Sequence, residues 1–566
     1  MKTWLLAGGI LLMGAESGAA LRVVYPPNGH QTTAPRIFLI GTHSPNEPVR
    51  VNGEVVLRSP AGHFAPSVPL TVGNNTVQIT AGSQSLTLNI RRSLPRRQAT
   101  PLVPAVDVAH LPGEPLCFQA VLPPTDGVKV HLGQWQVDLL PVPTPALAGN
   151  DTVLINSPVD HPEDGHITYK GCLRINQPGV WGQPQLVWGG QQWLSPGKVT
   201  ILDPDRLEVA TLIQEGIART GPSTDYSRLT PLPLGTQDQV IAQVGGDWVQ
   251  LRYGGWLHRR QVRTQVTSYA PQAILRGVHS RIGADWTEID FPLTTAIPLE
   301  IHQEPGVVDL TLWHTTAQTD TIRLDDGPAV RTFTWQQITP QQVRYRFFLH
   351  SAQAWGYRVN YQDHRLILAI RHPPKLRPNS LQGIKILLDP GHGGDEDLGA
   401  LGPDGTPEKQ VNLQVALLLA EQLKKRGATV ILTRTTDVDV GLGERVALIQ
   451  NQAPHLALSI HYNALPDAGD VWQTQGIGTF WYHPHSHDLA VFLHEYLTQK
   501  AQRPSYGIFW NNLALTRPTV CPAVLLELGF MIHPQEFEWL IQPPAQIRLA
   551  QTLAQGIEIW LRKSVR

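Results

Sequence analysis

The chain has 566 residues, and 45 Lys and Arg against 46 Asp and Glu give it a formal net charge of −1 at pH 7. This balance argues against a basic nucleic-acid-binding protein. A hydrophobic fraction of 42%, with 16 Trp, excludes a disordered chain, and the length predicts several domains, each able to close its own core.

The N-terminus has the pattern of a secretory signal. Within residues 1–20, Lys2 precedes an apolar stretch at 4–13, and small residues follow at 17–20. The alternative is a short membrane anchor, but the apolar stretch is shorter than the ~20 residues that a spanning helix needs. We therefore expect cleavage, export to the periplasm or cell envelope, and no transmembrane segment in the mature chain.

Two β-rich stretches follow. Residues 21–92 alternate apolar and polar positions between turn signals, which predicts a small β-sandwich. A hairpin at Val51-Asn52-Gly53 and a turn at Gly73-Asn74-Asn75 resemble those of bacterial immunoglobulin-like modules. A linker rich in proline and charge separates this module from residues 105–203, where we predict a second β domain of unknown role.

The three cysteines fall in two places. Cys117 and Cys172 lie in the second β-rich stretch and are candidates for a disulfide, which suits an exported protein. Cys521 stands between Val520 and Pro522 at the start of an apolar run, so we expect a buried free thiol there.

Residues 206–267 combine short strands with glycine turns and resemble a bacterial SH3-like barrel. Trp248 and Trp256 leave two interpretations open: the rings line a groove for a cell-wall ligand, or they belong to the core. Residues 270–375 are also β-rich and, through the Trp355-Gly356-Tyr357 turn, resemble bacterial envelope-targeting β modules.

From about residue 383 to residue 566, strand patterns alternate with helical patterns, which predicts an α/β domain. The predicted strands are 384–388, 428–432, 456–460, 478–482 and 523–526. The predicted helices are 407–426, 442–452, 488–499 and 547–561. The predicted fold class is therefore a multi-domain protein in which all-β modules, a β-sandwich and an SH3-like barrel among them, precede a C-terminal α/β domain.

Two histidines and two carboxylates stand at the ends of these elements. His392 follows the first strand, and His461 follows the third. Glu408 lies in the first turn of the first helix, where Thr406 is the predicted cap, and Glu527 ends the most apolar strand. Each alone has an ordinary explanation, as a turn residue, a helix cap or a hydrogen-bonded core residue. Their common location at the edges of one α/β unit favours a ligand site.

Two imidazoles and one carboxylate match the ligands of a catalytic Zn²⁺ site that keeps a fourth position for water. We predict that His392, Glu408 and His461 are the zinc ligands. Glu527 is then the nearby base, because a buried glutamate is costly unless it is paired, protonated or close to a metal.

These residues lie in four ordered motifs. The motifs D-P-G-H-G-G, T-P-E-K, S-I-H-Y-N-A and L-L-E-L-G-F resemble those of the zinc-dependent N-acetylmuramoyl-L-alanine amidases of bacterial cell walls. The resemblance covers residues 383–564 and implies a zinc hydrolase domain with the same three ligands and the same catalytic glutamate. It also implies the substrate: peptidoglycan, cut at the amide between N-acetylmuramic acid and the L-alanine of the stem peptide. The chain departs from the family at Ile532-His533, where a small polar residue and an asparagine are usual.

Two rival functions stay open. One is a non-catalytic cell-wall-binding scaffold with an inactive amidase domain, and the other is a zinc peptidase that cuts within the stem peptide. We expect a monomer that the β modules hold on the cell wall.

Two segments of the α/β domain need their own interpretation. The run His483-Pro484-His485-Ser486-His487 suggests a second metal site, but Pro484 favours an exposed loop. Some family members insert a blocking helix between residues corresponding to 482 and 512, and this segment is too short for one. In the helix predicted there, at 488–499, Glu495 lies off the apolar stripe. We therefore expect Glu495 to face solvent and the enzyme to need no activator.

Overall fold

The computed structural model describes residues 20–94, 101–143, 153 and 166–565. All but the last residue of the predicted signal peptide lies outside these ranges. Among the described residues, no helix is both long enough and apolar enough to cross a membrane.

The first β module packs its alternating apolar residues between small sheets, with a core that includes Ile37, Phe64 and Ile79. Its sheets have the strand orders β1-β4-β7, β2-β10-β9-β5-β6 and β3-β8. The strands are β1 (Arg22–Tyr25), β2 (Gln31–Thr32), β3 (Arg36–Phe38), β4 (Ile40–Thr42), β5 (Val49–Val51), β6 (Glu54–Val55), β7 (His63–Phe64), β8 (Ser67–Pro69), β9 (Gly73–Ala81) and β10 (Gln84–Arg92).

The next stretch forms two further sheets, in the orders β11-β13-β17-β16 and β15-β14-β19-β20. A disulfide joins Cys117 to Cys172 across neighbouring strands, which confirms the predicted pair. The strands are β11 (Leu102–Val103), β12 (Val108–His110), β13 (Pro115–Leu122), β14 (Lys129–Leu132), β15 (Trp135–Asp138), β16 (Leu140–Val142), β17 (Ile167–Arg174), β18 (Gly179–Gly182), β19 (Gln185–Trp188), β20 (Gln191–Leu194) and β21 (Val199–Ile201).

The segment predicted to be SH3-like shares a sheet with the module before it. β12 pairs with β23, so that Val108 lies opposite Val244, and sheet hydrogen bonds therefore cross the predicted boundary between residues 203 and 206. Trp248 and Trp256 are both half-buried, so the choice between groove and core stays open. The strands are β22 (Leu207–Leu212), β23 (Gln237–Val244), β24 (Trp248–Leu251), β25 (Trp256–His258) and β26 (Val262–Thr267).

The fourth β module is a sandwich of two sheets, in the orders β31-β27-β28-β35-β34 and β29-β30-β33-β32, around a core rich in aromatic residues. Its strands are β27 (Ala273–Ile282), β28 (Trp286–Pro292), β29 (Leu299–Glu304), β30 (Val307–Trp313), β31 (Thr315–Arg323), β32 (Val330–Thr339), β33 (Gln342–Leu349), β34 (Tyr357–Gln362) and β35 (Arg365–Arg371).

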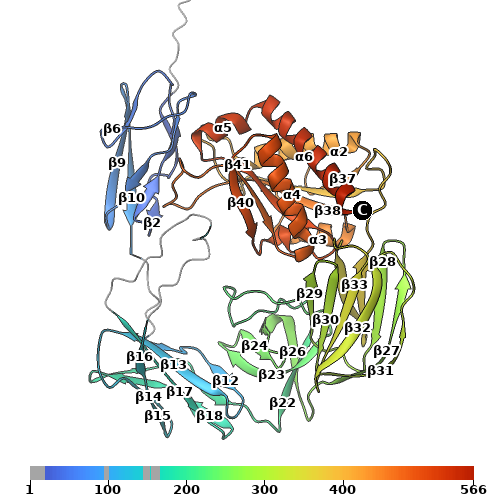
Figure 1. Cartoon of the computed structure of the whole chain (residues 1–566). Helices are drawn as coiled ribbons and strands as arrows, with labels where there is room; N and C mark the ends of the chain where they lie inside the picture. Colours follow the sequence, from blue (N-terminus) through green and yellow to red (C-terminus); the bar gives the residue numbers. More distant parts are fainter. Residues whose placement is uncertain (1–19, 95–100, 144–152, 154–165, 566) are drawn as a thin grey trace, which may run out of the picture.

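The C-terminal domain has a mixed sheet in the order β37-β36-β38-β41-β39-β40. Strands β37, β36, β38 and β41 run parallel, whereas β39 is antiparallel to β41. The strands are β36 (Lys385–Pro390), β37 (Thr429–Leu432), β38 (Leu456–Asn463), β39 (Ile477–Trp481), β40 (Ser505–Trp510) and β41 (Ala523–Phe530). The change from β modules to an α/β domain confirms the predicted fold class (Figure 1).

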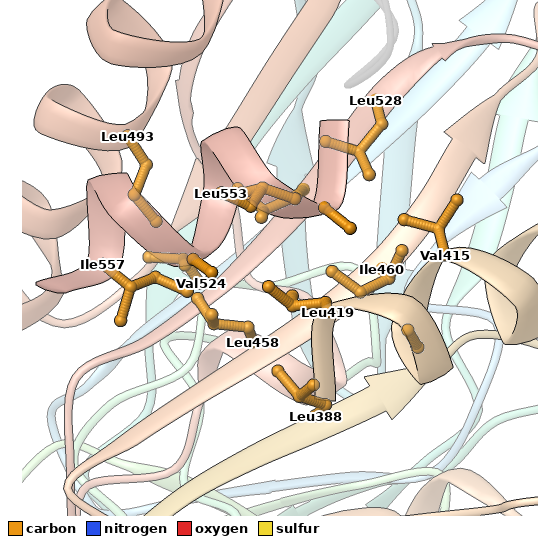
Figure 2. Close-up of a cluster of buried hydrophobic side chains, with 14 of the residues drawn as sticks. Leu388, Val415, Leu419, Leu458, Ile460, Leu493, Val524, Leu528, Leu553 and Ile557 are labelled. Carbon is orange, nitrogen blue, oxygen red and sulfur yellow. The ribbon is translucent and has the colours of Figure 1, made fainter. Parts of the chain in front are cut away.

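Helices cover both faces of this sheet. On one face, side chains from α2, α4 and α6 interlock with the strands in a core that includes Leu419, Ile460 and Leu553 (Figure 2). On the other face, α3 contributes Ile449 to a smaller cluster with Leu387 and Ala457. The helices are α2 (Glu408–Lys425), α3 (Leu442–Gln452), α4 (Pro484–Lys500), α5 (Pro534–Leu540) and α6 (Pro543–Ser564).

Three local predictions are wrong. Thr406 does not cap α2: the N-cap is Pro407, which forms no side-chain cap hydrogen bond. His461 and Glu527 lie inside their strands, because β38 and β41 run further than predicted. The histidine run is not an exposed loop, since α4 begins at Pro484. Proline suits the first turn of a helix, where its missing N–H would have no intrahelical partner.

The histidine run lies where the fourth β module packs on the C-terminal domain. His485 is buried; its Nε2 donates to the carbonyl oxygen of Cys521 at 3.1 Å, and its Nδ1 lies 2.8 Å from the Gln303 side chain. Cys521 itself is a buried free thiol, as predicted. Arg371 reinforces the same interface by donating to the carbonyl oxygen of Val520 at 3.0 Å.

This interface predicts a loss of stability in acid. Burial lowers the pKa of His485 to about 3 and that of His483 to about 4, whereas both titrate near ~6.5 when the chain is unfolded. Below pH ~6.5 the unfolded chain binds protons that the folded chain does not, so stability falls with pH toward these lower values. Between pH 7 and pH 5 each histidine should cost about 2 kcal/mol.

Urea unfolding followed by Trp fluorescence at both pH values measures this loss. His485→Gln should remove about 2 kcal/mol of the pH dependence. If the free energy of unfolding of His485→Gln falls between pH 7 and pH 5 by as much as that of the wild type, His485 is not a source of the acid loss.

Candidate metal centre and active site

The fold brings the three candidate ligands together. His392 Nε2 lies 3.2 Å from Glu408 Oε2, and His461 Nδ1 lies 3.0 Å from Glu408 Oε1. One nitrogen of each histidine and one carboxylate oxygen all lie within 4.8 Å of one another. Asp397 accepts a hydrogen bond from His392 Nδ1 at 2.6 Å, which leaves Nε2 as the nitrogen that faces the group.

Two glycines make room for these side chains. A methyl group at Gly391 would meet the His461 ring at 2.1 Å. At Gly399, which has φ +68°, a methyl group would lie 2.5 Å from Glu408 Oε2 and 2.7 Å from His392 Cδ2. Side chains at either position would therefore displace a candidate ligand.

Two buried arginines hold the loop that carries His392, whose φ of 59° is rare outside glycine. Arg434 and Arg445 donate to carbonyl oxygens of residues 390–392 at distances from 2.7 to 3.0 Å. Arg445 also donates to Asp389 Oδ1 at 2.7 Å, so its charge is paired within the protein. The rare backbone conformation is thus maintained by the surrounding structure.

Helix α2 places Glu408 between the two histidines, where it is only 3% exposed. Its oxygens accept hydrogen bonds from the backbone N–H groups of Tyr462 at 3.1 Å and Ala400 at 2.9 Å. Asn412, one turn along α2, donates to Glu408 Oε1 at 3.0 Å. The carboxylate is therefore fixed before any ligand binds.

Glu408, His392 and His461 strongly shift one another's pKa values. Burial would raise the pKa of Glu408, but hydrogen bonds from His392 and His461 lower it well below its usual range. Burial would also lower the pKa of His392, but the hydrogen bond and charge of Glu408, followed by those of Asp397, raise it to about 9. A metal cation bound here would displace any proton from the nitrogen of each imidazole that faces it.

Glu527 lies beside this group, because it pairs with His461 on the neighbouring parallel strand. Burial raises its pKa to about 8, although the charge of His461 opposes the shift. Its Oε2 is buried and has no hydrogen-bond partner among the described residues. The donor set suits zinc, and this free carboxylate oxygen suits a group that exchanges a proton.

The sequence did not indicate the supporting residues. Arg434, Arg445 and Asp389 act through contacts between distant segments, which no local pattern records. Asp389 offered one signal, a carboxylate at the end of an apolar strand directly before the Pro390-Gly391-His392 turn.

Comparison with known proteins identifies the domain. The family model for N-acetylmuramoyl-L-alanine amidase matches residues 386–559. The C-terminal domain belongs to this amidase family. The match leaves the β modules before residue 386 outside the family model.

The amidase domain is similar to curated and solved proteins. It is 35% identical over 183 residues to "Probable cell wall amidase LytH" of Staphylococcus aureus, covering 32% of this chain and 60% of that protein. The chain thus spans about 60% of the length of the curated relatives that it matches.

Among solved structures, the N-acetylmuramoyl-L-alanine amidase of Clostridium difficile 630 is 30% identical, with a TM-score of 0.30. The match covers 33% of this chain and 98% of that one. The catalytic domain of CwlV from Bacillus (Paenibacillus) polymyxa var. colistinus is 32% identical, with a TM-score of 0.30 and coverage of 32% and 98%.

Proposed function

We propose that the protein is a zinc-dependent N-acetylmuramoyl-L-alanine amidase that hydrolyses peptidoglycan. The observation that supports this proposal best is the group of His392, Glu408 and His461, with the unpartnered carboxylate oxygen of Glu527 beside it. The substrate bond is the amide between the lactyl group of N-acetylmuramic acid and the L-alanine of the stem peptide.

In this proposal His392, Glu408 and His461 would hold Zn²⁺, which would supply Lewis-acid polarisation of the scissile carbonyl and activation of water. Glu527 moves the proton: its free Oε2 takes it from the attacking water and gives it to the amine nitrogen of L-alanine as the C–N bond breaks. Burial raises the pKa of Glu527, so its ionised carboxylate is a stronger base than that of an exposed glutamate and readily accepts the proton from water. Asp397 keeps the His392 ring oriented by accepting a hydrogen bond from His392 Nδ1–H.

We also propose that the protein acts outside the cytoplasm, in the periplasm or cell envelope, with peptidoglycan as its partner and as a monomer. The amidase family and the disulfide between Cys117 and Cys172 both suit that setting.

Digestion of purified muropeptides by the full chain tests the proposal. We expect mass spectrometry to show free stem peptides that begin with L-alanine, together with sugar fragments that keep the lactyl group. Cleavage inside the stem peptide would instead establish the peptidase alternative. Intact muropeptides after loading with Zn²⁺ would favour the scaffold alternative.

A further inference from the structure

The first β module, far from the amidase domain in sequence, packs against it (Figure 1). The two share an apolar cluster of buried residues, with Phe38, Ile40 and Ala65 from the module and Val471, Phe530 and Ile532 from the amidase domain. Two hydrogen bonds of 2.7 Å extend the contact, from Arg22 to the carbonyl oxygen of Asp404 and from the N–H of Ala61 to the carboxylate of Glu538. The module is thus docked on the catalytic unit.

The module holds the loop at residues 464–476, which joins β38 to β39. Asp467 in this loop accepts hydrogen bonds from the Tyr25 hydroxyl and from His30 Nε2, the latter at 3.0 Å. The N–H of Phe38 donates to the carbonyl oxygen of Asp467 at 3.2 Å. Because β38 carries His461 and β39 borders Glu527, this loop connects the two strands that flank the catalytic carboxylate.

A β-bulge in β40 sets the direction of the Tyr506 side chain, which lies near the catalytic carboxylate of Glu527. Ile477 pairs with Ser505 and the next residue, Gly478, pairs with Gly507, so Tyr506 is the extra residue in β40. Bulges near active sites re-aim a side chain in this way. A methyl group at Gly478 would lie 3.0 Å from the Tyr506 ring and 3.5 Å from Cβ of Glu527, so both side chains lie beside Gly478.

Tyr506 also connects Glu527 to the docked module. Its ring packs edge-on against Phe530, with 5.0 Å between ring centroids, and lies against the shared apolar cluster. On its other side, Phe509 lies 5.0 Å away, and Phe509 stacks on Phe480. The half-buried Tyr506 and Phe509 therefore form, with Phe480, an aromatic wall along one side of the catalytic carboxylate.

We propose that the first β module helps to form the substrate-binding site of the amidase domain. Tyr506 binds substrate beside Glu527, and Phe38 and Asp467 are positioning residues that hold Tyr506 in place. The inference rests on the proposed amidase function. It differs from a role for this module as a tether to the cell wall, because a tether does not need to pack against Phe530 and Ile532, which follow Glu527 in the chain. Glu408 is held by α2, His392 by the two arginines that support its loop, and His461 by its place inside β38 at the centre of the sheet, so loss of the docked module should weaken substrate binding and leave the metal in place.

Phe38→Glu in the full chain tests the proposal, because it places a charge in the apolar cluster, where Phe38 is 2% exposed. Val55→Glu is the matched control: it adds the same charge to the same module at a position that is 59% exposed. With a soluble muropeptide, Phe38→Glu should raise KM about tenfold and change kcat less than about twofold, with zinc content unchanged. Val55→Glu should match the wild type.

A double-mutant cycle tests whether the module acts through Tyr506. Tyr506→Ala should also raise KM about tenfold, and the Phe38→Glu, Tyr506→Ala double variant should be no worse than either single variant. Asp467→Ala, which removes the contacts to Tyr25 and His30 without adding a charge, gives the same test if Phe38→Glu does not fold.

If the wild type is active and Phe38→Glu has an unchanged KM, the proposal is overturned. It is also overturned if the KM increases of the two single variants multiply in the double variant. A wild type that leaves muropeptides intact would overturn the proposed amidase function instead.

Discussion

Glu527→Gln in the full chain is expected to keep its zinc and to lose at least about a hundredfold in kcat. The amide has the size of the carboxylate but cannot accept a proton from water, and it removes the negative charge beside His461. Because Glu527 is not among the three candidate ligands, the metal content should stay at one equivalent. Metal analysis and muropeptide turnover on the same preparation measure both parts.

Glu495→Gln is the matched control, since Glu495 lies in α4 of the same domain and is exposed, as predicted. It should leave kcat and zinc content unchanged. Turnover of Glu527→Gln close to that of this control would remove Glu527 from the mechanism. A loss of zinc together with activity would instead make Glu527 a ligand.

The sequence predicted the α/β domain well because its apolar pattern is strong. The predicted strands at 384–388 and 456–460 correspond to β36 and β38, and both are buried by helices on two faces. Val411, Val415 and Leu419 recur with the helical period and are all buried on one side of α2. Periodicity reports burial directly, so elements with a clear buried face are found from sequence.

The candidate site was also visible in the sequence, for a related reason. Polar residues that interrupt apolar runs, such as His461 and Glu527, are costly to bury and so indicate a function. Strand length was underestimated at both positions, because these polar residues look like strand ends although β38 and β41 continue beyond them.

What the sequence did not predict depends on distant contacts. Helix α5 has seven residues, too few to show a period, and β40 is a bulged edge strand with Gly507 near its centre. The docking of the first β module joins Tyr25 to Asp467, which are 442 residues apart. Neither partner carries a local signal for such a contact.

His461→Ala should abolish both zinc binding and hydrolysis. It removes one of three donors, and the remaining imidazole and carboxylate cannot maintain a tetrahedral site with an open position. We expect the dissociation constant for zinc to rise by at least about a hundredfold, since even changes around a metal ligand cost 10- to 100-fold in metal affinity.

His487→Ala is the control, because His487 is an exposed histidine of the same domain and lies on the Trp481 ring rather than near Glu408. Competition with a chelator measures both affinities. If His461→Ala binds zinc as tightly as His487→Ala does, then His461 is not a ligand and the proposed site must be built from other residues.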